Sequence, residues 1–219
     1  MEKVGGQYAL TKRYRHPSMQ AIVRQKASGG LCFDLEKTVE MLTKALTFIE
    51  AVAKKEGSLF FVSTRRETAD MVQKTAEELS QPYMVNRWVG GTISNFKNVR
   101  SRVERMEKLV KEREEGRWTH YTKKEKVLMT RELGKLQGKF SGIASMTERP
   151  AALIVFDTKR EKIAVSEAIR SKIPVIGFSN ANADLRAAQY PVPMNIYSRE
   201  AVAYLLGLVK EAYTKGKEG

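Results

Sequence analysis

The sequence predicts an α/β fold: a mostly parallel sheet flanked by helices in Rossmann-like or flavodoxin-like layers, with an inserted antiparallel helical hairpin. Short apolar runs alternate with amphipathic segments of helical spacing, as parallel sheets covered by helices require. The 219 residues are 42% hydrophobic and 29% charged, enough for one sizeable core. We expect a single domain over residues 1–219, with a basic N-terminal arm (1–30), the hairpin (97–145) and a disordered, Gly- and Lys-rich tail (214–219).

The first half of the chain predicts two helices and two strands. Residues 37–55 carry apolar side chains on one stripe at helical spacing, namely Val39, Leu42, Leu46, Ile49 and Val52. Residues 58–62 are typical of a buried strand, 67–79 of a helix and 82–85 of a second short strand. The second strand leads directly into residues 86–96, which carry the most informative motif of the chain.

A long charged interval over residues 97–145 predicts the hairpin. In its first arm, apolar residues recur at intervals of four, three and four, at Val99, Val103, Met106 and Val110. Thr122-Lys123-Lys124-Glu125 resembles a capping box that starts the second arm. There the apolar positions are Met129, Leu133, Leu136, Phe140 and Ile143. Two such narrow seams favour antiparallel helices paired as a coiled coil. The excess of positive charge in this interval favours RNA backbone or another protein as the neighbour of the hairpin.

The second half resumes the alternation. Residues 151–156 and 173–178 are short apolar runs typical of strands, and residues 163–171 and 198–212 have helical spacing. In this architecture, functional residues gather where the carboxyl ends of strands open into loops. The loops after the predicted strands are therefore the first place to look for a site.

Three of these strand ends are polar: Ser63-Thr64-Arg65-Arg66, Asp157-Thr158-Lys159-Arg160 and Ser179-Asn180-Ala181-Asn182. The first two place hydroxyls and basic side chains near a helix start, where free N–H groups and the helix dipole favour an anion. Arg65 and Arg66 are therefore candidate phosphate contacts. The alternative is that Thr64 and Thr158 cap helices while the basic side chains are solvated.

The excess of positive charge indicates a polyanionic partner. The chain has 39 Lys and Arg residues against 25 Asp and Glu residues, a formal net charge of +14 and a sequence pI near 9.8. A membrane surface is the competing polyanion, but the sequence has no apolar run long enough to span one and no lipidation signal. We therefore expect a nucleic-acid partner and no membrane.

Residue counts argue against several kinds of site. Cys32 is the single cysteine, which excludes an internal disulfide and favours a reducing compartment, and the two histidines lie far apart, which argues against a metal site. The Gly-rich motifs of nucleotide enzymes are missing, and Asp157 has no identifiable titratable partner for catalysis. We expect no catalytic residue, metal, cofactor or small-molecule substrate. An α/β enzyme acting on nucleotides or RNA is the alternative.

Residues 86–96 combine the groups that a nucleic-acid contact uses. Arg87 can pair with a phosphate, Trp88 can stack on a base, and Gly90-Gly91 lets backbone N–H groups approach a polyanion. The alternative is that Trp88 and its apolar neighbours belong to the core. The candidate RNA-binding residues in this stretch and at the start of the first hairpin arm are Asn86, Arg87, Trp88, Gly90, Gly91, Thr92, Asn95, Lys97 and Arg100.

The N-terminal arm is also basic, with aromatic side chains interleaved. Its candidate RNA-binding residues are Lys12, Arg13, Arg15, Arg24 and Lys26. Basic and planar side chains together suit phosphate contact plus stacking on exposed bases. A flexible, solubilising tail is the alternative, but the apolar run 21–23 indicates that part of the arm is ordered.

The string Asn-Arg-Trp-x-Gly-Gly-x-x-x-Asn-Phe-Lys over residues 86–97 closely resembles the signature of the small-ribosomal-subunit protein S-two family, in its bacterial and organellar form. Further segments match the family in order along nearly the whole chain, at residues 31–38, 60–65, 122–125, 150–153, 156–158, 164–168 and 173–175. Only the signature is specific by itself. The common order of the segments supports the resemblance.

The resemblance implies a non-enzymatic ribosomal protein that binds small-subunit rRNA near the junction of head and body, on the solvent side. Its partners would be this rRNA and neighbouring ribosomal proteins, and bacterial members also help to dock the large mRNA-binding ribosomal protein S-one. The implied location is a bacterial-type ribosome in the cytoplasm, with a mitochondrial or plastid ribosome as the alternative.

The chain departs from the family pattern near both ends. Residues 6–10 and 14–17 replace the usual Gly-x-His-Phe-Gly-His and Trp-Asn-Pro stretches, and residues 179–184 and 193–196 replace an Asp-Thr-Asn-x-Asp-Pro and an acidic Pro-Gly-Asn-Asp. These departures indicate a divergent member from a bacterial lineage or an organelle. They affect the terminal contacts and S-one docking most.

Overall fold

The main sheet consists of five parallel strands in the order β4-β3-β5-β6-β7 in the computed structural model, which describes residues 1–26 and 30–218. The strands are β3 (Leu59–Val62), β4 (Tyr83–Met84), β5 (Ala152–Phe156), β6 (Val175–Ser179) and β7 (Tyr190–Pro193). Counted within this sheet, the order is 2-1-3-4-5, as in flavodoxin-like folds. The predicted fold class is confirmed.

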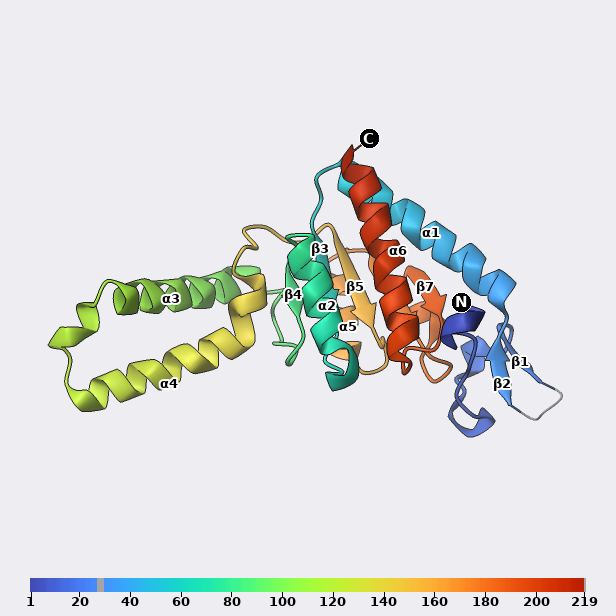
Figure 1. Cartoon of the computed structure of the whole chain (residues 1–219), viewed down its shortest axis with the longest axis horizontal. Helices are drawn as coiled ribbons and strands as arrows, with labels where there is room; N and C mark the ends of the chain where they lie inside the picture. The colour runs from blue at the N-terminus through green and yellow to red at the C-terminus, as the bar shows by residue number, and fades with distance from the viewer. Residues whose placement is uncertain (27–29, 219) are drawn as a thin grey trace.

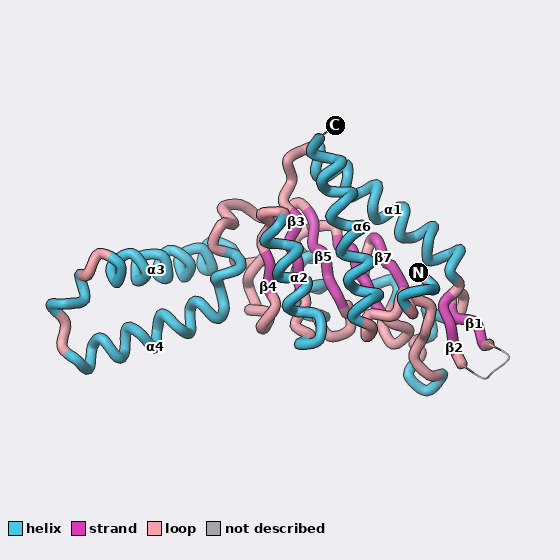
Figure 2. Tube along the Cα trace, in the orientation of Figure 1, coloured by secondary structure: helices cyan, strands magenta, loops and turns pink. Residues whose placement is uncertain are grey.

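Helices cover both faces of this sheet (Figures 1 and 2). On one face lie α1 (Leu35–Lys54), α2 (Arg66–Glu78) and α6 (Arg199–Glu218), and on the other lies α5 (Lys162–Arg170). Successive strand residues serve opposite faces: Phe61 packs in the first core and Phe60 in the second. Strands buried on both sides explain why their sequences are continuous apolar runs.

The interval predicted as a hairpin contains two helices, α3 (Phe96–Glu114) and α4 (Lys123–Phe140), joined through the short 3-10 helix η4 (Arg117–His120). They project together from the β4 edge of the sheet (Figure 1). The buried seam residues on these helices are Val99, Val103, Met106, Leu109, Leu133 and Phe140. The capping box at Thr122 and Glu125 is confirmed, and a coiled-coil winding of the two helices stays a prediction.

The N-terminal arm lies at the opposite side of the sheet and contains 3-10 helices η1 (Glu2–Val4), η2 (Lys12–Tyr14) and η3 (Pro17–Met19) and the antiparallel pair β1 (Val23–Gln25) and β2 (Leu31–Phe33). Residues 27–29 of the predicted arm lie outside the described residues. Ile22 and Phe33 pack with Ala181 in a small separate core. The arm is therefore fixed to the domain and is not a loose tail.

The C-terminal prediction is wrong. Residues 214–218 continue α6 as helix, and Gly216 is buried against Glu50 and Ala53 of α1. A glycine permits this close approach of the two helices, and Lys215 adds an ion pair of 3.0 Å to Glu50. The composition indicated disorder because it does not show the contact with α1. Gly219 lies outside the described residues.

Candidate nucleic-acid interface

Trp88 is part of the core and does not form a stacking platform. Its side chain is 8% exposed, its ring lies 5.6 Å from that of Phe60 on β3, and its Nε1 donates to Glu167 of α5 at 3.4 Å. The prediction that Trp88 contacts RNA is therefore wrong, and the alternative core interpretation is right. The physical reason is that the indole packs against the large apolar surface on the face of the sheet that carries Phe60.

In the loop that contains Gly90 and Gly91, the backbone N–H of Gly91 is already bonded within the chain. Gly91 has a φ of +90°, a conformation that glycine adopts readily, and its N–H donates to Oε1 of Glu167 at 2.7 Å. Ile93 donates to the other oxygen of the same carboxylate at 3.3 Å. The Glu167 carboxylate thus occupies the N–H of Gly91 that was expected to face a phosphate, and a direct RNA contact by Gly91 stays a prediction.

Thr92, another signature residue, also serves the loop itself. It is fully buried, and its hydroxyl donates to the carbonyl of Val89 at 2.6 Å. A buried and paired hydroxyl cannot reach a ligand at the surface. The prediction of a direct RNA contact by Thr92 is therefore corrected.

Other signature residues do face solvent. Arg87, Gly90, Asn95 and Lys97 are exposed, and the side chains of Arg87 and Lys97 form no hydrogen bond or ion pair within the described part of the chain. Asn86 is exposed too, but its amide donates to the carbonyl of Gly138 on α4 at 2.8 Å. The signature segment thus carries two cations available to a partner, Arg87 in the loop and Lys97 at the start of α3.

Arg100 on α3 is used inside the hairpin. Its Nη1 donates to the carbonyl of Ala144 at 2.8 Å, and the guanidinium lies 3.3 Å from Glu107 and 3.7 Å from Glu104. The side chain is 26% exposed. Arg100 thus joins α3 to the segment after α4 through Nη1 and pairs with two acids of α3 itself, so its guanidinium is partly engaged within the chain, and an RNA contact by Arg100 stays a prediction.

The paired arginines after β3 have different environments. Arg65 pairs with Asp157 at 3.3 Å, lies 4.3 Å above the ring of Tyr197, and has a side chain that is 14% exposed. Arg66, the first residue of α2, is exposed and has no ion pair with another described residue. Arg65 therefore holds the loops after β3 and β5 together, and only Arg66 remains a candidate phosphate contact.

The start of α2 is also occupied by a carboxylate of the chain. Glu161, just before α5, is 4% exposed and accepts from the backbone N–H of Thr64 at 3.0 Å and from its hydroxyl. Arg160 donates to the same hydroxyl at 3.0 Å. β3 and β5 flank the point where the strand order reverses, which is the usual ligand crevice of such sheets. Here the chain's own side chains bridge that point.

The basic residues of the arm form a second group at the other side of the domain. Lys12, Arg13 and Lys26 are exposed, and Arg15 is half-buried. Arg24 pairs with the buried Asp34 at 2.6 Å, but its side chain remains 70% exposed. The fold therefore separates the predicted contacts into an arm group and a signature group, with Arg66 between them in the sheet order.

A comparison with known protein families supports the resemblance carried by residues 86–97. The model of the family described as ribosomal protein S2 matches residues 3–216 of the 219. The chain belongs to the ribosomal protein S2 family. It is therefore a small-subunit ribosomal protein, a structural component of the ribosome and not an enzyme, with rRNA and other ribosomal proteins as its partners. The resemblance read from the sequence is confirmed, and the enzyme alternative is wrong.

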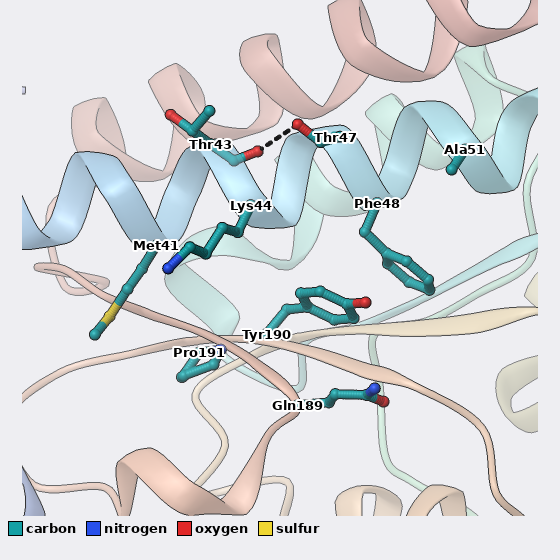
Figure 3. Close-up of a pocket in the computed structure, with 9 residues that line it drawn as sticks. All are labelled: Met41, Thr43, Lys44, Thr47, Phe48, Ala51, Gln189, Tyr190 and Pro191. Carbon is teal, nitrogen blue, oxygen red and sulfur yellow. Dashed lines mark hydrogen bonds between the residues drawn. The ribbon is translucent and has the colours of Figure 1, made fainter.

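An apolar pocket of this S2 chain lies between α1 and the outer edge of β7 (Figure 3). Its volume is about 480 Å³, and the stacked rings of Phe48 and Tyr190, 4.3 Å apart, form part of its wall. Lys44 is its one charged lining residue and pairs with Glu40 at 2.6 Å. The lining contributes no group to an RNA contact.

In the portion that the structure describes, the helices are too short or too polar to cross a lipid bilayer. The same portion contains no group of three or more His, Cys, Asp or Glu side chains arranged to hold a metal ion.

Sequence reasoning missed Glu167, which organises the signature loop. It lies within the helix predicted over residues 163–171, but 76 residues from Gly91. The available signal was a single carboxylate at a position that faces the sheet, where an acid is rarely buried unless it is paired.

Proposed function

We propose that this S2-family chain binds small-subunit rRNA directly, near the junction of the head and body of the subunit, as a structural constituent that supports translation. The proposal rests on a difference among the basic side chains of the candidate site: some are paired within the chain and others are not. Arg65 and Arg100 are engaged by groups of the chain, whereas Arg87, Lys97 and Arg66 are exposed without such partners. Unpaired surface cations on a chain of net charge +14 favour a phosphate backbone.

Two groups of residues would make the contact. The signature group consists of Arg87, Gly90, Asn95 and Lys97, with Asn86 bridging to α4, and the arm group consists of Lys12, Arg13, Arg15, Arg24 and Lys26. Affinity would come from neutralised phosphates and would fall steeply with salt. Selectivity would come from RNA shape and exposed bases, since the two groups are held at a fixed separation by the sheet.

The double variant Arg87→Ala with Lys97→Ala tests the signature group. It should lower the occupancy of the chain in small subunits on sucrose gradients and flatten the salt dependence of its binding to small-subunit rRNA, with an unchanged circular dichroism spectrum. The matched control is Lys54→Ala with Lys74→Ala, which removes the same charge from exposed positions on α1 and α2. Equal occupancy of the two double variants would contradict the contact assignment.

The proposal also covers the compartment of the ribosome and one neighbouring protein. We infer a bacterial-type ribosome in the cytoplasm, with the mitochondrial or plastid ribosome as the alternative, and ribosomal protein S-one as a neighbour. Purification of the ribosomes that contain this chain from a cytoplasmic and from an organellar fraction decides the compartment. Subunits depleted of the chain should also lose S-one, and retention of S-one would contradict that part.

The four segments that depart from the family pattern lie together, which bears on that partner. Leu10 donates to the side chain of Asn180 at 3.1 Å, His16 to the carbonyl of Ala181 at 2.8 Å, and Asn195 to the carbonyl of Gly6 at 3.0 Å. The changes at the two ends of the chain therefore lie in one region of the fold. Any contact that this lineage has altered would lie there, while the signature loop keeps the family pattern.

A further inference from the structure

The two helices of the hairpin use their cations differently. Four of the seven basic residues of α3 form ion pairs, namely Arg100, Arg105, Lys108 and Lys111. In α4, the six basic residues form no ion pair with any residue that the structure describes: Lys123, Lys124, Lys126, Arg131, Lys135 and Lys139. The two acids of α4 are occupied, Glu125 by the capping box and Glu132 by Arg105 at 3.2 Å.

The unpaired cations of α4 share one face. Lys124, Arg131 and Lys135 are separated by seven and four residues, which places them on the same side of a helix, opposite the buried Leu133 and Phe140. All three are exposed. Because the acids of α4 project elsewhere and are engaged, this outer face is cationic without compensation.

Two glycines open the same face. Gly134 and Gly138 are exposed, and a Cβ added at either one would meet no atom of the chain within 4 Å. Glycine in a helix interior is destabilising relative to alanine, and the chain's own packing gives no reason for it here. A bare stretch of helix between lysines and arginines allows another backbone to approach closely.

We propose that the outer face of α4 docks on the phosphate backbone of small-subunit rRNA, with Lys124, Arg131 and Lys135 pairing with phosphates and the two glycines admitting the backbone. The inference rests on the proposed function and names a further contact surface for it. RNA is favoured over an acidic protein because this face is continuous with the signature loop: Asn86, the neighbour of Arg87, donates to the carbonyl of Gly138.

The glycines provide a test in which stability and binding move in opposite directions. Gly134→Ala with Gly138→Ala should raise the thermal midpoint of the free chain, because alanine favours helix, and should lower its affinity for small-subunit rRNA and its occupancy in subunits. Gly207→Ala is the control, since Gly207 is exposed on α6 and also has open space around its Cα. It should raise the midpoint and leave binding unchanged. Unchanged binding by the double variant would overturn the role of the glycines.

The cations are tested by charge removal with a matched control. Lys124→Gln, Arg131→Gln and Lys135→Gln together should flatten the slope of log affinity for small-subunit rRNA against log salt by about 2, as expected for three lost phosphate contacts. The α3 triple variant Arg102→Gln, Lys108→Gln and Lys111→Gln should change the slope much less. If the α4 triple is without effect while Arg87→Ala with Lys97→Ala still weakens binding, this inference fails and the proposed function stands.

Crosslinking in assembled particles separates RNA from protein as the occupant. Leu128 lies on the same face and is 54% exposed, so a photoreactive benzoylphenylalanine placed there reports what lies against α4. Adducts with small-subunit rRNA would support the proposal. Adducts with ribosomal proteins alone would overturn it.

Discussion

The carboxylate of Glu167 accepts a hydrogen bond of 2.7 Å from the backbone N–H of Gly91, and it also accepts one of 3.3 Å from Ile93. Anion-binding loops arrange backbone N–H groups in the same way around a phosphate. In this chain the anion is built in and comes from α5. The consequence is that the signature loop is shaped in the absence of RNA, so that Arg87 and Lys97 lie on a preformed surface.

Glu167→Gln should destabilise the fold and loosen this loop. The amide retains one acceptor oxygen but turns an NH₂ group toward N–H donors, leaving a buried donor unsatisfied at a cost of about 1–3 kcal/mol. Urea unfolding measures the loss. In a Trp118→Phe background, the remaining Trp88 should show a red-shifted fluorescence maximum as its environment becomes more polar.

The control for this variant is Glu211→Gln, on the exposed side of α6. It makes the same chemical change where no described hydrogen bond depends on the carboxylate, so its unfolding free energy should match that of the parent. If Glu167→Gln were as stable as Glu211→Gln, the loop would not depend on Glu167.

The adjacent residues Arg65 and Arg66 should behave in opposite ways on alanine substitution. Arg65→Ala leaves the buried Asp157 without its ion-pair partner, and it should lower the free energy of unfolding by about 2 kcal/mol or more. Arg66→Ala removes an exposed cation, so it should leave stability within about 0.5 kcal/mol of the parent and weaken binding to small-subunit rRNA. Urea unfolding and salt-dependent RNA binding of both variants decide the point. Equal stability losses would contradict the assignment.

The spacing of apolar residues along the sequence was sufficient to predict most of the fold. The apolar runs that became β3 and β5, and the helical stripes of α1 and α2, follow from periodicity because those segments are buried by their own neighbours. β7 was missed because Pro191 and Pro193 argue against a strand. It is tolerated as an edge strand, since only one of its sides pairs with β6.

The candidate site was less predictable than the fold, for a physical reason. Sequence shows which groups could bind an anion, but it does not show whether another part of the chain already satisfies them. Arg65 and Asp157 lie 92 residues apart and Thr64 and Glu161 lie 97 apart. The Arg65–Asp157 pair engages one predicted RNA contact within the chain, whereas Arg87 and Lys97 remain candidates because no described side chain or backbone group pairs with them.

The two glycines of α6 test the unexpected C-terminal helix. A Cβ at Gly216 would lie 2.7 Å from that of Ala53, so Gly216→Ala must push α6 away from α1 and should lower the free energy of unfolding by about 1–3 kcal/mol. Gly207→Ala meets open space on the same helix and should raise that free energy by up to about 1 kcal/mol. Thermal and urea unfolding measure both variants. A stabilising Gly216→Ala would mean that the end of α6 is not docked.

Alkaline pH should weaken the link between β4 and α2. Burial, together with the hydrogen bond of 2.7 Å that Tyr83 donates to Glu77 and the charge of that carboxylate, raises the pKa of Tyr83 to about 12 from a usual value of 10.0. Because the raised pKa favours the protonated phenol in the folded state, its contribution is complete below about pH 10 and is lost as the pH rises toward 12. The difference in unfolding free energy between the parent and Tyr83→Phe should therefore shrink across this window in urea titrations. Glu77→Gln keeps the burial of Tyr83 and removes the neighbouring charge, so this variant should retain part of the pH dependence. If the difference in unfolding free energy between the parent and Tyr83→Phe stays constant from pH 10 to 12, the assignment is contradicted.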